Sequence, residues 1–456
     1  MHWENEHVLV IGSGASGLCS TQLLLDEGAT VILYDGNKKI QEESIRTKLK
    51  NTTKVQVILG DLPESILTKI TLVVVSPGVP LDLPILCKIK ECALPIWGEI
   101  ELAYVCGSGQ VLAITGTNGK TTTTTLLGEI MKAYCAKTYV VGNIGIPYTQ
   151  VARQSTSESI IVAELSSFQL ETIHAFHPKV SAILNLSPDH LDRHYTMEAY
   201  IEAKANITSN QTKEDICILN YEDSLVKALA KNTEAKVWFF SASNLVERGM
   251  YLQNNKLIYV NETTEILCDV EELKLLGIHN YENVMAASLM ALAFGVPIET
   301  VREVVKGFEG VAHRIEYVGE YDGVKYYNDS KGTNPDAAIK AIQAMERPTF
   351  LIAGGYDKQA DYKEWIQAFD GKVRKLVLLG DTKEIIATQA KALGVKDIIL
   401  VETLEEALHV CKGHAREGEA VLLSPACASW GMFRNYEERG DMFKQIVREG
   451  GVRKDE

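Results

Sequence analysis

The stretch "HVLVIGSGASGLCS", residues 7–20, places a glycine-rich turn between an apolar run and a helical segment. Gly12, Gly14 and Gly17 complete the pattern G-x-G-x-x-G, and a second apolar run, "TVILYD", ends on Asp35. A strand, such a turn, a helix and a second strand make up the βαβ unit that binds dinucleotides. The segment therefore predicts an α/β fold with a diphosphate-binding turn, and it raises the hypothesis of a nicotinamide- or flavin-dependent oxidoreductase.

Strand candidates and helical segments alternate along the whole chain, a pattern typical of α/β proteins with mainly parallel sheets. Four apolar runs lie within the first 80 residues, residues 93–110 interrupt the pattern, and five more runs follow from "VLAITG" to "DICILN". Short strands with polar turns at residues 236–270 predict an antiparallel patch, and residues 280–295 predict an amphipathic helix. A last group of strands follows "GFEGVAHR", so we predict three domains: 1–97, 98–310 and 311–456.

The composition is ordinary for a globular protein but acidic, with a formal net charge of −14 over 456 residues. This charge argues against non-specific nucleic-acid binding, so anionic ligands require local groups of Lys, Arg and backbone N–H. We find no run of roughly 18 apolar residues, as a membrane span needs, and no signal peptide. The nine cysteines show no CxxC pair and are typical of reduced thiols. We expect a cytoplasmic protein, with a monomer as the default.

A second glycine-rich turn, "AITGTNGKTTTT" at residues 113–124, also follows a strand and precedes a helix. Backbone N–H groups of such a turn, together with the helix N-terminus, bind phosphate oxygens. Lys120 would reach the β- and γ-phosphates, and the Thr121 hydroxyl could bind Mg²⁺. The alternative is a simple turn before a threonine-rich helix. A nucleoside triphosphate site weakens the oxidoreductase hypothesis, because a dehydrogenase has no use for a second phosphate-binding turn.

Acidic and imidazole side chains follow two of the predicted strands of the central segment. Glu164 ends the run "SIIVAEL", and Asp189 and His190 come just after "VSAILNL". Open α/β sheets bind ligands at the carboxyl ends of their strands, and Mg²⁺ prefers oxygen ligands. The alternatives are a helix-capping or solvent-facing Glu164 and a packed His190. For Asp192 and His194 we favour structural roles.

Several further motifs occur along the chain in one order: "GTNGKTT", "GNIG", "ELSSFQLE", "NLSPDHLDRH", "HN..N", "HR", "NDSKGTNPDA", "GGYDK" and "LLSPACASWGMFRNYEERG". Together they resemble the Mur ligases over essentially the whole length. The pair "ELSSFQLE" and "SPACAS…EERG" resembles the D-glutamate-adding member, since sister ligases share the ATP turn and differ at these two places.

This resemblance implies an α/β protein of three domains: an N-terminal Rossmann-like domain for a UDP-sugar, a central P-loop ATPase-type domain with a parallel sheet, and a Rossmann-like C-terminal domain for the amino acid. It implies that ATP phosphorylates the carboxylate of UDP-N-acetylmuramoyl-L-alanine and that the D-glutamate amine attacks the acyl phosphate, in peptidoglycan precursor synthesis. The alternatives are a sister ligase, a ligase that extends folate with glutamate, a nicotinamide-dependent oxidoreductase and a catalytically silent nucleotide-binding module.

The same resemblance assigns residues to ATP and metal. ATP contacts are implied for Gly116, Thr117, Asn118, Gly119, Lys120, Thr121, Thr122, Asn280, Asn283, Arg314 and Asp329. Two Mg²⁺ ions are implied, with Thr121, Glu164, His190 and a carbamylated Lys204 as ligands. Lys120, Glu164, His190 and Lys204 are the implied catalytic groups. From the residues alone, Lys204 is only a lysine on an amphipathic helix, normally solvated.

The two remaining ligands also take their residues from the resemblance. UDP-substrate contacts are implied for Ala15, Ser16, Asp35, Ser76, Pro77, Gly78 and Asn143. D-Glutamate contacts are implied for Lys331, Thr333, Lys358, Ser429 and Trp430, with the two lysines facing its acid groups. The chain departs from the usual family pattern in "GNKK" after Asp35, which passes a UDP contact to Lys38 or Lys39, in "GGYDK", in "GMF" and at Trp430, where Leu or Phe is usual.

Overall fold

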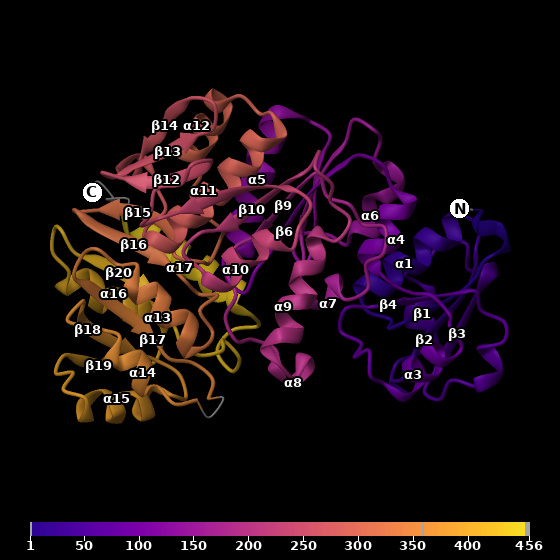
Figure 1. Ribbon diagram of the computed structural model, residues 1–456. Coiled ribbons are helices and arrows are strands. Elements are labelled where there is room, and N and C mark those ends of the chain that lie inside the picture. Colours follow the sequence, from indigo (N-terminus) through magenta and orange to yellow (C-terminus); the bar gives the residue numbers. More distant parts are fainter. Residues whose placement is uncertain (1, 358–359, 452–456) are drawn as a thin grey trace. The chain divides into compact units, whose positions relative to one another are not determined.

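The computed structural model describes residues 2–357 and 360–451, and in them the chain forms three sheets (Figure 1). The contacts divide the chain into two compact units, which we describe separately. Unit 1 comprises residues 1–270 and 282–305, and unit 2 comprises residues 271–281 and 306–456.

The N-terminal sheet of unit 1 has five parallel strands in the order β3-β2-β1-β4-β5. Its strands are β1 (His7–Ile11), β2 (Thr30–Asp35), β3 (Val55–Leu59), β4 (Leu72–Val75) and β5 (Ile96–Gly98), and its helices are α1 (Ala15–Asp26), α2 (Glu42–Arg46) and α3 (Pro84–Glu91). Alternate residues of β1 enter different cores. Val8 and Val10 share a core with residues of α1, whereas Leu9 and Ile11 share one with residues of α3. The sheet is therefore covered on both faces.

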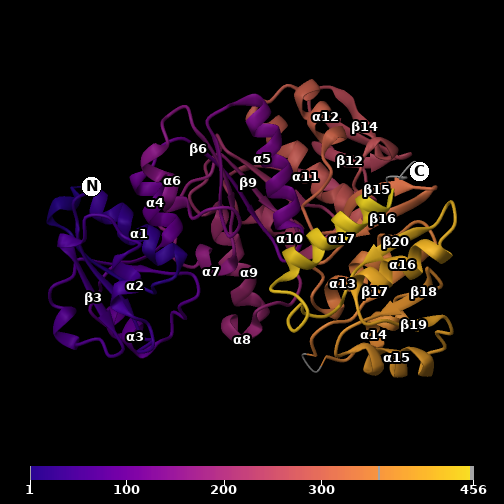
Figure 2. The ribbon, with the colours of Figure 1, turned by 180° about the vertical axis from the view of Figure 1, so that it is seen from behind.

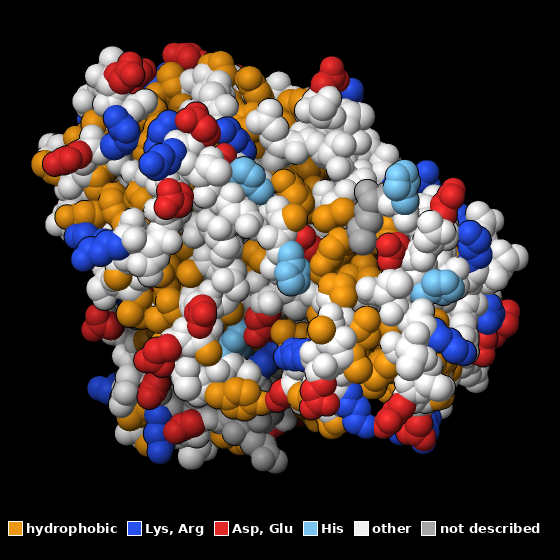
Figure 3. All heavy atoms as spheres, turned by 45° about the vertical axis from the view of Figure 1, so that its right-hand side comes forward, with side chains coloured by type: hydrophobic (Ala, Val, Ile, Leu, Met, Phe, Trp, Pro, Cys, Tyr) orange, Lys and Arg blue, Asp and Glu red, His pale blue; other side chains and the backbone are white. Residues whose placement is uncertain are grey.

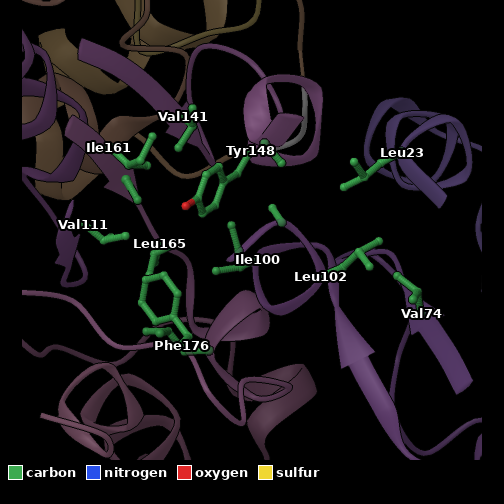
Figure 4. Packing of buried hydrophobic residues seen from close by; sticks show 14 of the residues in the cluster. Leu23, Val74, Ile100, Leu102, Val111, Val141, Tyr148, Ile161, Leu165 and Phe176 are labelled. Atoms are coloured by element: carbon green, nitrogen blue, oxygen red, sulfur yellow. The ribbon is translucent and has the colours of Figure 1, made fainter. Parts of the chain in front are cut away.

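The interrupted segment at residues 93–110 contains β5 and α4 (Glu99–Cys106), which the sequence pattern did not reveal. Strand β5 is only three residues long, and α4 has five consecutive buried residues, so neither shows a clear period. Figure 4 shows the reason: Leu102 of α4 lies toward Leu23 and Val74, while Ile100 lies toward Tyr148 and Phe176. Helix α4 is thus buried within one continuous core of unit 1.

The second sheet of unit 1 has nine strands in the order β14-β13-β12-β11-β10-β9-β6-β8-β7. The strands from β12 to β7 are parallel, and β12, β13 and β14 pair antiparallel. The antiparallel patch predicted at residues 236–270 is therefore confirmed for residues 249–269, whereas residues 236–241 pair parallel with both neighbouring strands. Their bounds are β6 (Gln110–Thr115), β7 (Thr138–Gly142), β8 (Ile160–Glu164), β9 (Val180–Ile183), β10 (Ile216–Asn220), β11 (Lys236–Ser241), β12 (Gly249–Gln253), β13 (Lys256–Val260) and β14 (Thr264–Asp269).

The helices between these strands are mostly short, apart from α5. They are α5 (Lys120–Tyr134), α6 (Tyr148–Val151), α7 (Ser167–Leu170), α8 (Leu191–His194), α9 (Met197–Ala205) and α10 (Ser224–Ala228). The chain continues through α11 (Ile278–Phe294), which covers the predicted helix at 280–295, and α12 (Ile298–Gly307).

Unit 2 contains a six-stranded sheet in the order β15-β16-β20-β17-β18-β19. It is parallel except for the β15–β16 pair, and β15 is a strand that the sequence analysis missed. The elements are β15 (Glu316–Tyr321), β16 (Val324–Asn328), α13 (Pro335–Gln343), β17 (Thr349–Ala353), α14 (Lys363–Gln367), β18 (Val373–Leu378), α15 (Lys383–Ala392), β19 (Ile398–Leu400), α16 (Leu404–His414), β20 (Ala420–Leu423) and α17 (Tyr436–Gly451). Cores lie on both faces of this sheet, and α17 packs against β15 and β16 (Figure 2).

The α/β fold class with mainly parallel sheets is confirmed, whereas the domain bounds at 97 and 310 stay predictions. Among the described helices, none combines the length and the low charge that crossing a membrane would need. On the face drawn in Figure 3, acidic and basic side chains are interspersed among those of the described residues.

Candidate active site

The first glycine-rich turn lies at the carboxyl end of β1, next to the loop that follows β4. After β1 the chain adds β2 and β3 on one side of that strand and then crosses to add β4 and β5 on the other side. Open α/β sheets bind ligands at the point where the strand order reverses in this way. A Cβ on Gly17 would lie 1.8 Å from the Gly12 carbonyl oxygen, so only glycine fits there. Helix α1 begins at Ala15, so its first N–H groups and its positive dipole end are available to an anion.

Asp35, at the end of β2, is bonded to this turn. Its Oδ2 accepts hydrogen bonds from the Ser13 backbone N–H at 2.9 Å and from the Ser13 hydroxyl at 2.6 Å. Burial alone would raise the pKa of Asp35, but the hydrogen bonds from Ser13 and Asn37 outweigh it and lower the pKa. Asp35 is therefore held as a carboxylate, an acceptor suited to hydroxyl or N–H groups of a nucleoside.

The loop after β4 forms a second wall of this site. The Ser76 hydroxyl is buried with no hydrogen-bond partner in the described part of the chain, and a Cβ on Gly12 would lie 2.8 Å from it. A hollow of about 420 Å³ lies beside the turn, with Ser13, Lys39 and Gln41 in its lining. Lys38 instead pairs with Asp61 at 2.8 Å, so Lys39 is the better placed of the two predicted lysines.

The second glycine-rich turn lies at the carboxyl end of β6, between β6 and α5. Gly116 and Gly119 have φ angles of +147° and +84°, which L side chains rarely adopt. A Cβ on Gly119 would lie 2.2 Å from Oδ1 of Asn283 on α11, a predicted ATP contact. The hydroxyl of Thr123 donates to the same oxygen at 3.3 Å. The turn is thus closely packed against Asn283.

Asn185, which follows β9 and opens the motif "NLSPDH", fixes this turn although we assigned it no role. Its carbonyl oxygen accepts from the Thr117 N–H at 2.9 Å, and its Oδ1 accepts from the Asn118 N–H at 2.7 Å. Its Nδ2 donates in return to the Asn118 carbonyl at 3.0 Å. Thr121 is partly buried and Thr122 is buried at the start of α5. Asn185 follows a strand that pairs with β6, and this position is the signal that could have identified it.

Two lysines from different helices donate to the same carbonyl of the turn. Lys120 Nζ lies 2.8 Å from the Gly116 oxygen and 2.9 Å from the Thr117 oxygen, and Lys204 Nζ lies 2.9 Å from the Gly116 oxygen. Lys204, on α9, is only 1% exposed. Burial, with help from the charge of Lys120, lowers the pKa of Lys204 to about 7. The sequence alone predicted a solvated Lys204, but in the structure its amine is buried and easily loses its proton.

Glu164, at the end of β8, lies next to Asn143, the residue after β7. Its Oε1 accepts from Asn143 Nδ2 at 2.8 Å, while its buried Oε2 has no hydrogen-bond partner in the described part of the chain. His190 is half exposed, lies at a φ of +53° and packs against Phe168 with ring centroids 4.9 Å apart. His194 is buried and bonds the Ser167 hydroxyl at 2.9 Å. The Asp192 side chain lies outside the part of the chain that the structure describes.

Unit 2 has a second cluster at the carboxyl ends of β16 and β20. Asp329 is buried, and its Oδ2 accepts from the Ser424 hydroxyl at 2.7 Å. Burial raises the pKa of Asp329 to about 7, against the opposing effects of Ser424 and the Arg314 charge. Asn280, on α11, donates from Nδ2 to the Leu276 carbonyl at 2.7 Å. The structure thus brings Asp329 near Arg314, as two predicted nucleotide contacts require.

Arg439, in the "EERG" motif on α17, is a buried residue that the sequence analysis did not single out. Its Nε and Nη2 donate to the hydroxyl and carbonyl of Ser330 at 2.9 and 2.8 Å, and its Nη groups reach the Cys427 carbonyl at 3.3 and 3.4 Å. Arg439 therefore joins the segments "NDSKGTN" and "SPACAS". Its motif was the available signal, but a buried role is not visible in sequence.

Three of the five predicted D-glutamate residues, Lys331, Thr333 and Ser429, lie in these segments, and Trp430 follows the second one directly. Ser429 is buried, whereas Trp430 is 55% exposed and packs against Tyr356 with ring centroids 5.6 Å apart. The Tyr356 N–H donates to the Ala428 carbonyl at 2.9 Å, so the loops after β17 and β20 are paired. Lys331 and Thr333 follow β16. Lys358 lies outside the described residues.

Comparison with known proteins assigns the family. The MurD-like N-terminal domain of Mur ligases matches residues 6–98, the Mur ligase middle domain matches 114–291, and the Mur ligase glutamate ligase domain matches 313–427. A UDP-N-acetylmuramoylalanine–D-glutamate ligase of Lachnoclostridium phytofermentans is 56% identical over 98% of this chain and 99% of its own length. The chain belongs to the Mur ligase family.

Other Mur ligases give the same result. Relatives with the same name from Lachnospira eligens and Clostridioides difficile are 50% and 46% identical, each over 98% of this chain and 99% of their own length. Among solved structures, the UDP-N-acetylmuramate–alanine ligase of Thermotoga maritima has a TM-score of 0.58 at 19% identity and covers 98% of this chain and 100% of its own. A MurF ligase from the same organism, solved with ADP, has a TM-score of 0.57 at 18% identity and covers 97% and 95%. These structures confirm the fold.

Mur ligases use ATP and Mg²⁺, and the central turn fits both. Gly116 to Gly119 form a backbone turn at a helix N-terminus, as a triphosphate requires. The partnerless Oε2 of Glu164 is a buried oxygen suited to a hard cation that keeps several waters. The described residues contain no group of three His, Cys, Asp or Glu side chains that could hold a metal.

Proposed function

We propose that this Mur ligase uses ATP to join D-glutamate to UDP-N-acetylmuramoyl-L-alanine, in the synthesis of peptidoglycan precursors. The observation that carries the proposal is the pair of glycine turns in unit 1, one after β1 and one after β6, each leading into a helix. Two such turns suit a reaction between a UDP-linked substrate and ATP. The full-length relatives support D-glutamate as the third substrate. A nicotinamide-dependent oxidoreductase, the alternative function, would have no use for the turn after β6.

The reaction makes an amide from a carboxylate, which is a poor electrophile until it carries a leaving group. A carboxylate oxygen of the L-alanine residue attacks the γ-phosphorus of ATP, and ADP leaves. The D-glutamate amine then attacks the acyl carbon, loses a proton, and phosphate leaves. The protein's contribution is to position these groups and to neutralise crowded negative charge.

The residues around the central turn have separate parts in this reaction. We assign Gly116 to Thr122 to the phosphates of ATP and Lys120 to the transferred phosphoryl group. Bound Mg²⁺ would neutralise phosphate oxygens, and Thr121, Glu164 and His190 would hold two such ions. We assign Asn143, whose Nδ2 donates to Glu164, to the UDP-substrate.

Lys204 supports a carbamate as a further metal ligand. Only a neutral amine attacks CO₂, and the pKa of about 7 caused by burial makes the neutral form abundant at physiological pH. The reaction forms a bond between Nζ and the carbon of CO₂ and releases one proton. The product carries a negative charge beside Lys120, which attracts the Lys120 ammonium group.

The remaining predicted contacts complete the proposal. Ala15, Ser16, Asp35 and the segment Ser76 to Gly78 would bind the UDP part. Asn280, Asn283, Arg314 and Asp329 would bind the nucleoside of ATP. Lys331, Thr333, Lys358, Ser429 and Trp430 would bind D-glutamate. We also propose that the protein acts in the cytoplasm and that it is a monomer. Sedimentation of the purified chain tests the monomer, and fractionation of cells tests the location.

One assay tests the reaction. Purified protein is incubated with ATP, Mg²⁺, UDP-N-acetylmuramoyl-L-alanine and each of a panel of amino acids, including D-glutamate, and phosphate release is measured. We expect release with D-glutamate. Release with another amino acid but none with D-glutamate would refute the specificity, and oxidation of NAD(P)H without ATP would refute a ligase.

A further inference from the structure

Arg193, in the one-turn helix α8, contacts two separate segments of unit 1, the turn at residues 76–79 and helix α7 with its C-cap. Its Nη1 donates to the Pro77 carbonyl at 2.7 Å, and its Nη2 donates to the Val79 carbonyl at 3.2 Å and to Glu171 Oε2 at 3.1 Å. Its guanidinium also lies 3.9 Å from the centre of the Phe168 ring. Both Arg193 and Glu171 are largely buried, with side-chain exposures of 14% and 21%. Such a contact set is more than a surface ion pair provides.

The turn that Arg193 holds is the one that faces the first glycine loop. The Val79 N–H donates to the Ser76 carbonyl at 3.0 Å, which closes residues 76–79 into a turn. In a trans peptide the C=O and the next N–H point in opposite directions. Because Arg193 holds the Pro77 carbonyl, the Gly78 N–H points away from Arg193. The guanidinium therefore fixes the orientation of this peptide.

The other end of the contact set leads to the ATP side of unit 1. Glu171 directly follows α7, which begins three residues after Glu164, and its Oε1 lies 3.4 Å from His194 Nδ1. His190 precedes Arg193 by three residues and packs on the same Phe168 ring. The α8 turn is bracketed by left-handed residues, His190 at φ +53° and Tyr195 at φ +65°. This backbone restricts the positions that the Arg193 side chain can take.

We propose that Arg193 is a positioning residue that sets the 76–79 turn for the diphosphate of the UDP-substrate and links it to the His190 loop. Arg193 acts through the Pro77 and Val79 carbonyls, not through contact with substrate. A planar fork is needed to hold two carbonyls and a carboxylate at once, and a lysine ammonium cannot reproduce it. The role rests on the proposed function, since it assumes a UDP-linked substrate.

The test compares Arg193→Lys and Arg193→Met with the wild type. Loss of hydrogen bonds from a charged group corresponds to roughly a tenfold effect or more. We expect the KM for UDP-N-acetylmuramoyl-L-alanine to rise about tenfold in Arg193→Lys and further in Arg193→Met, while the KM for ATP changes less than about twofold. Glu171→Gln, which keeps the size of the side chain, should shift the same KM by about threefold.

Arg153→Met is the matched control, because Arg153 also reaches the N-terminal segment of the chain, through Glu27 just after α1 at 3.1 Å, but it is half exposed. It should leave both KM values unchanged. Equal rises in the KM for ATP and for the UDP-substrate, or no rise in either, would overturn the proposal. Titration of UDP itself by calorimetry gives a second readout that needs no turnover. If the wild type binds UDP but does not turn over, the proposed function fails, whereas undiminished UDP affinity in both Arg193 variants refutes the role of Arg193.

Discussion

The two glycine turns of unit 1 share a backbone plan and differ in the charges around them. Each follows a parallel strand, leads into a helix and offers N–H groups to an anion. The turn after β1 is bonded to a carboxylate, Asp35, whereas the turn after β6 accepts hydrogen bonds from Lys120 and Lys204. Backbone geometry therefore specifies a phosphate, and the neighbouring side chains specify which molecule carries it and whether it reacts.

This difference explains why the first turn suits binding and the second suits phosphoryl transfer. A resting diphosphate needs close backbone approach and a helix dipole, and Asp35 can accept from the nucleoside beside it. A γ-phosphoryl group in transit needs mobile positive charge, because charge spreads over its oxygens in the transition state. Lys120 at the Gly116 carbonyl supplies such charge, and the carbamate that we propose on Lys204 would hold Mg²⁺ beside it. We therefore expect stabilisation of the negative charge in the transition state at the second turn and not at the first.

Lys120→Met gives the sharpest test of this contrast. We expect kcat to fall roughly a thousandfold, because the variant loses the cation on the transferred phosphoryl group, while affinity for UDP stays as in the wild type. Phosphate release and UDP calorimetry measure the two effects. Lys132→Met, in the last turn of the same helix, is the control and should retain full activity. A Lys120→Met enzyme that turns over within tenfold of the wild type would contradict the assignment.

Lys204→Ala should reduce activity by about a hundredfold, since it removes the proposed carbamate from the neighbourhood of Lys120. Added short carboxylates such as acetate should restore part of the rate, because they can enter the space that the side chain leaves. The exposed Lys213→Ala serves as control and should neither lose activity nor respond to acetate. A Lys204→Ala variant with normal turnover, or one that acetate does not improve, would exclude the carbamate.

The glycines of the first turn separate fold from ligand. Gly17→Ala places a Cβ 1.8 Å from the Gly12 oxygen, so α1 must shift; we expect a lower Tm and about a tenfold higher KM for the UDP-substrate. A Cβ on Gly14 would meet no atom within 4 Å, so Gly14→Ala should keep the wild-type Tm and raise only that KM. Thermal unfolding and steady-state rates measure both. Equal Tm losses would mean that the turn is shaped by something other than the Gly12–Gly17 contact.

The sequence predicted those strands and helices that show a clear pattern of apolar and polar residues within their own length. The strands that precede both turns are apolar and bounded by glycine, so they were identified correctly, and Glu164 and His190 were placed at strand ends because parallel strands share one edge. Strand β5 and helix α4 were missed because Glu99 and Glu101 are buried inside a run that shows no polar face. Contacts between distant segments leave no local signal in a single chain.

The same limit applies to the sites. Lys204 looks like a solvated lysine in sequence, and only the fold places it beside Gly116. Asn185 and Arg439 lie inside quoted motifs, yet their partners are about 67 and 109 residues away in the chain. The resemblance to Mur ligases supplied Lys204, since it carries information from related chains that this sequence alone does not.

Asp35→Asn has the smallest expected effect and tests the acidic half of the comparison through pH. The pKa of Asp35 is lower in the folded chain than in the unfolded one, so the carboxylate contributes stability above its ordinary pKa of 3.8, and that stability is lost as pH falls through the folded value. The Tm of Asp35→Asn should therefore lie below that of the wild type at pH 7, and the difference should begin to shrink below about pH 4 and disappear below the lowered pKa. Ser13→Ala, which removes one donor to Asp35, should show a weaker form of the same behaviour. A Tm difference that does not change with pH would mean that Asp35 acts through its shape, and the charge contrast between the two turns would then rest on the lysines alone.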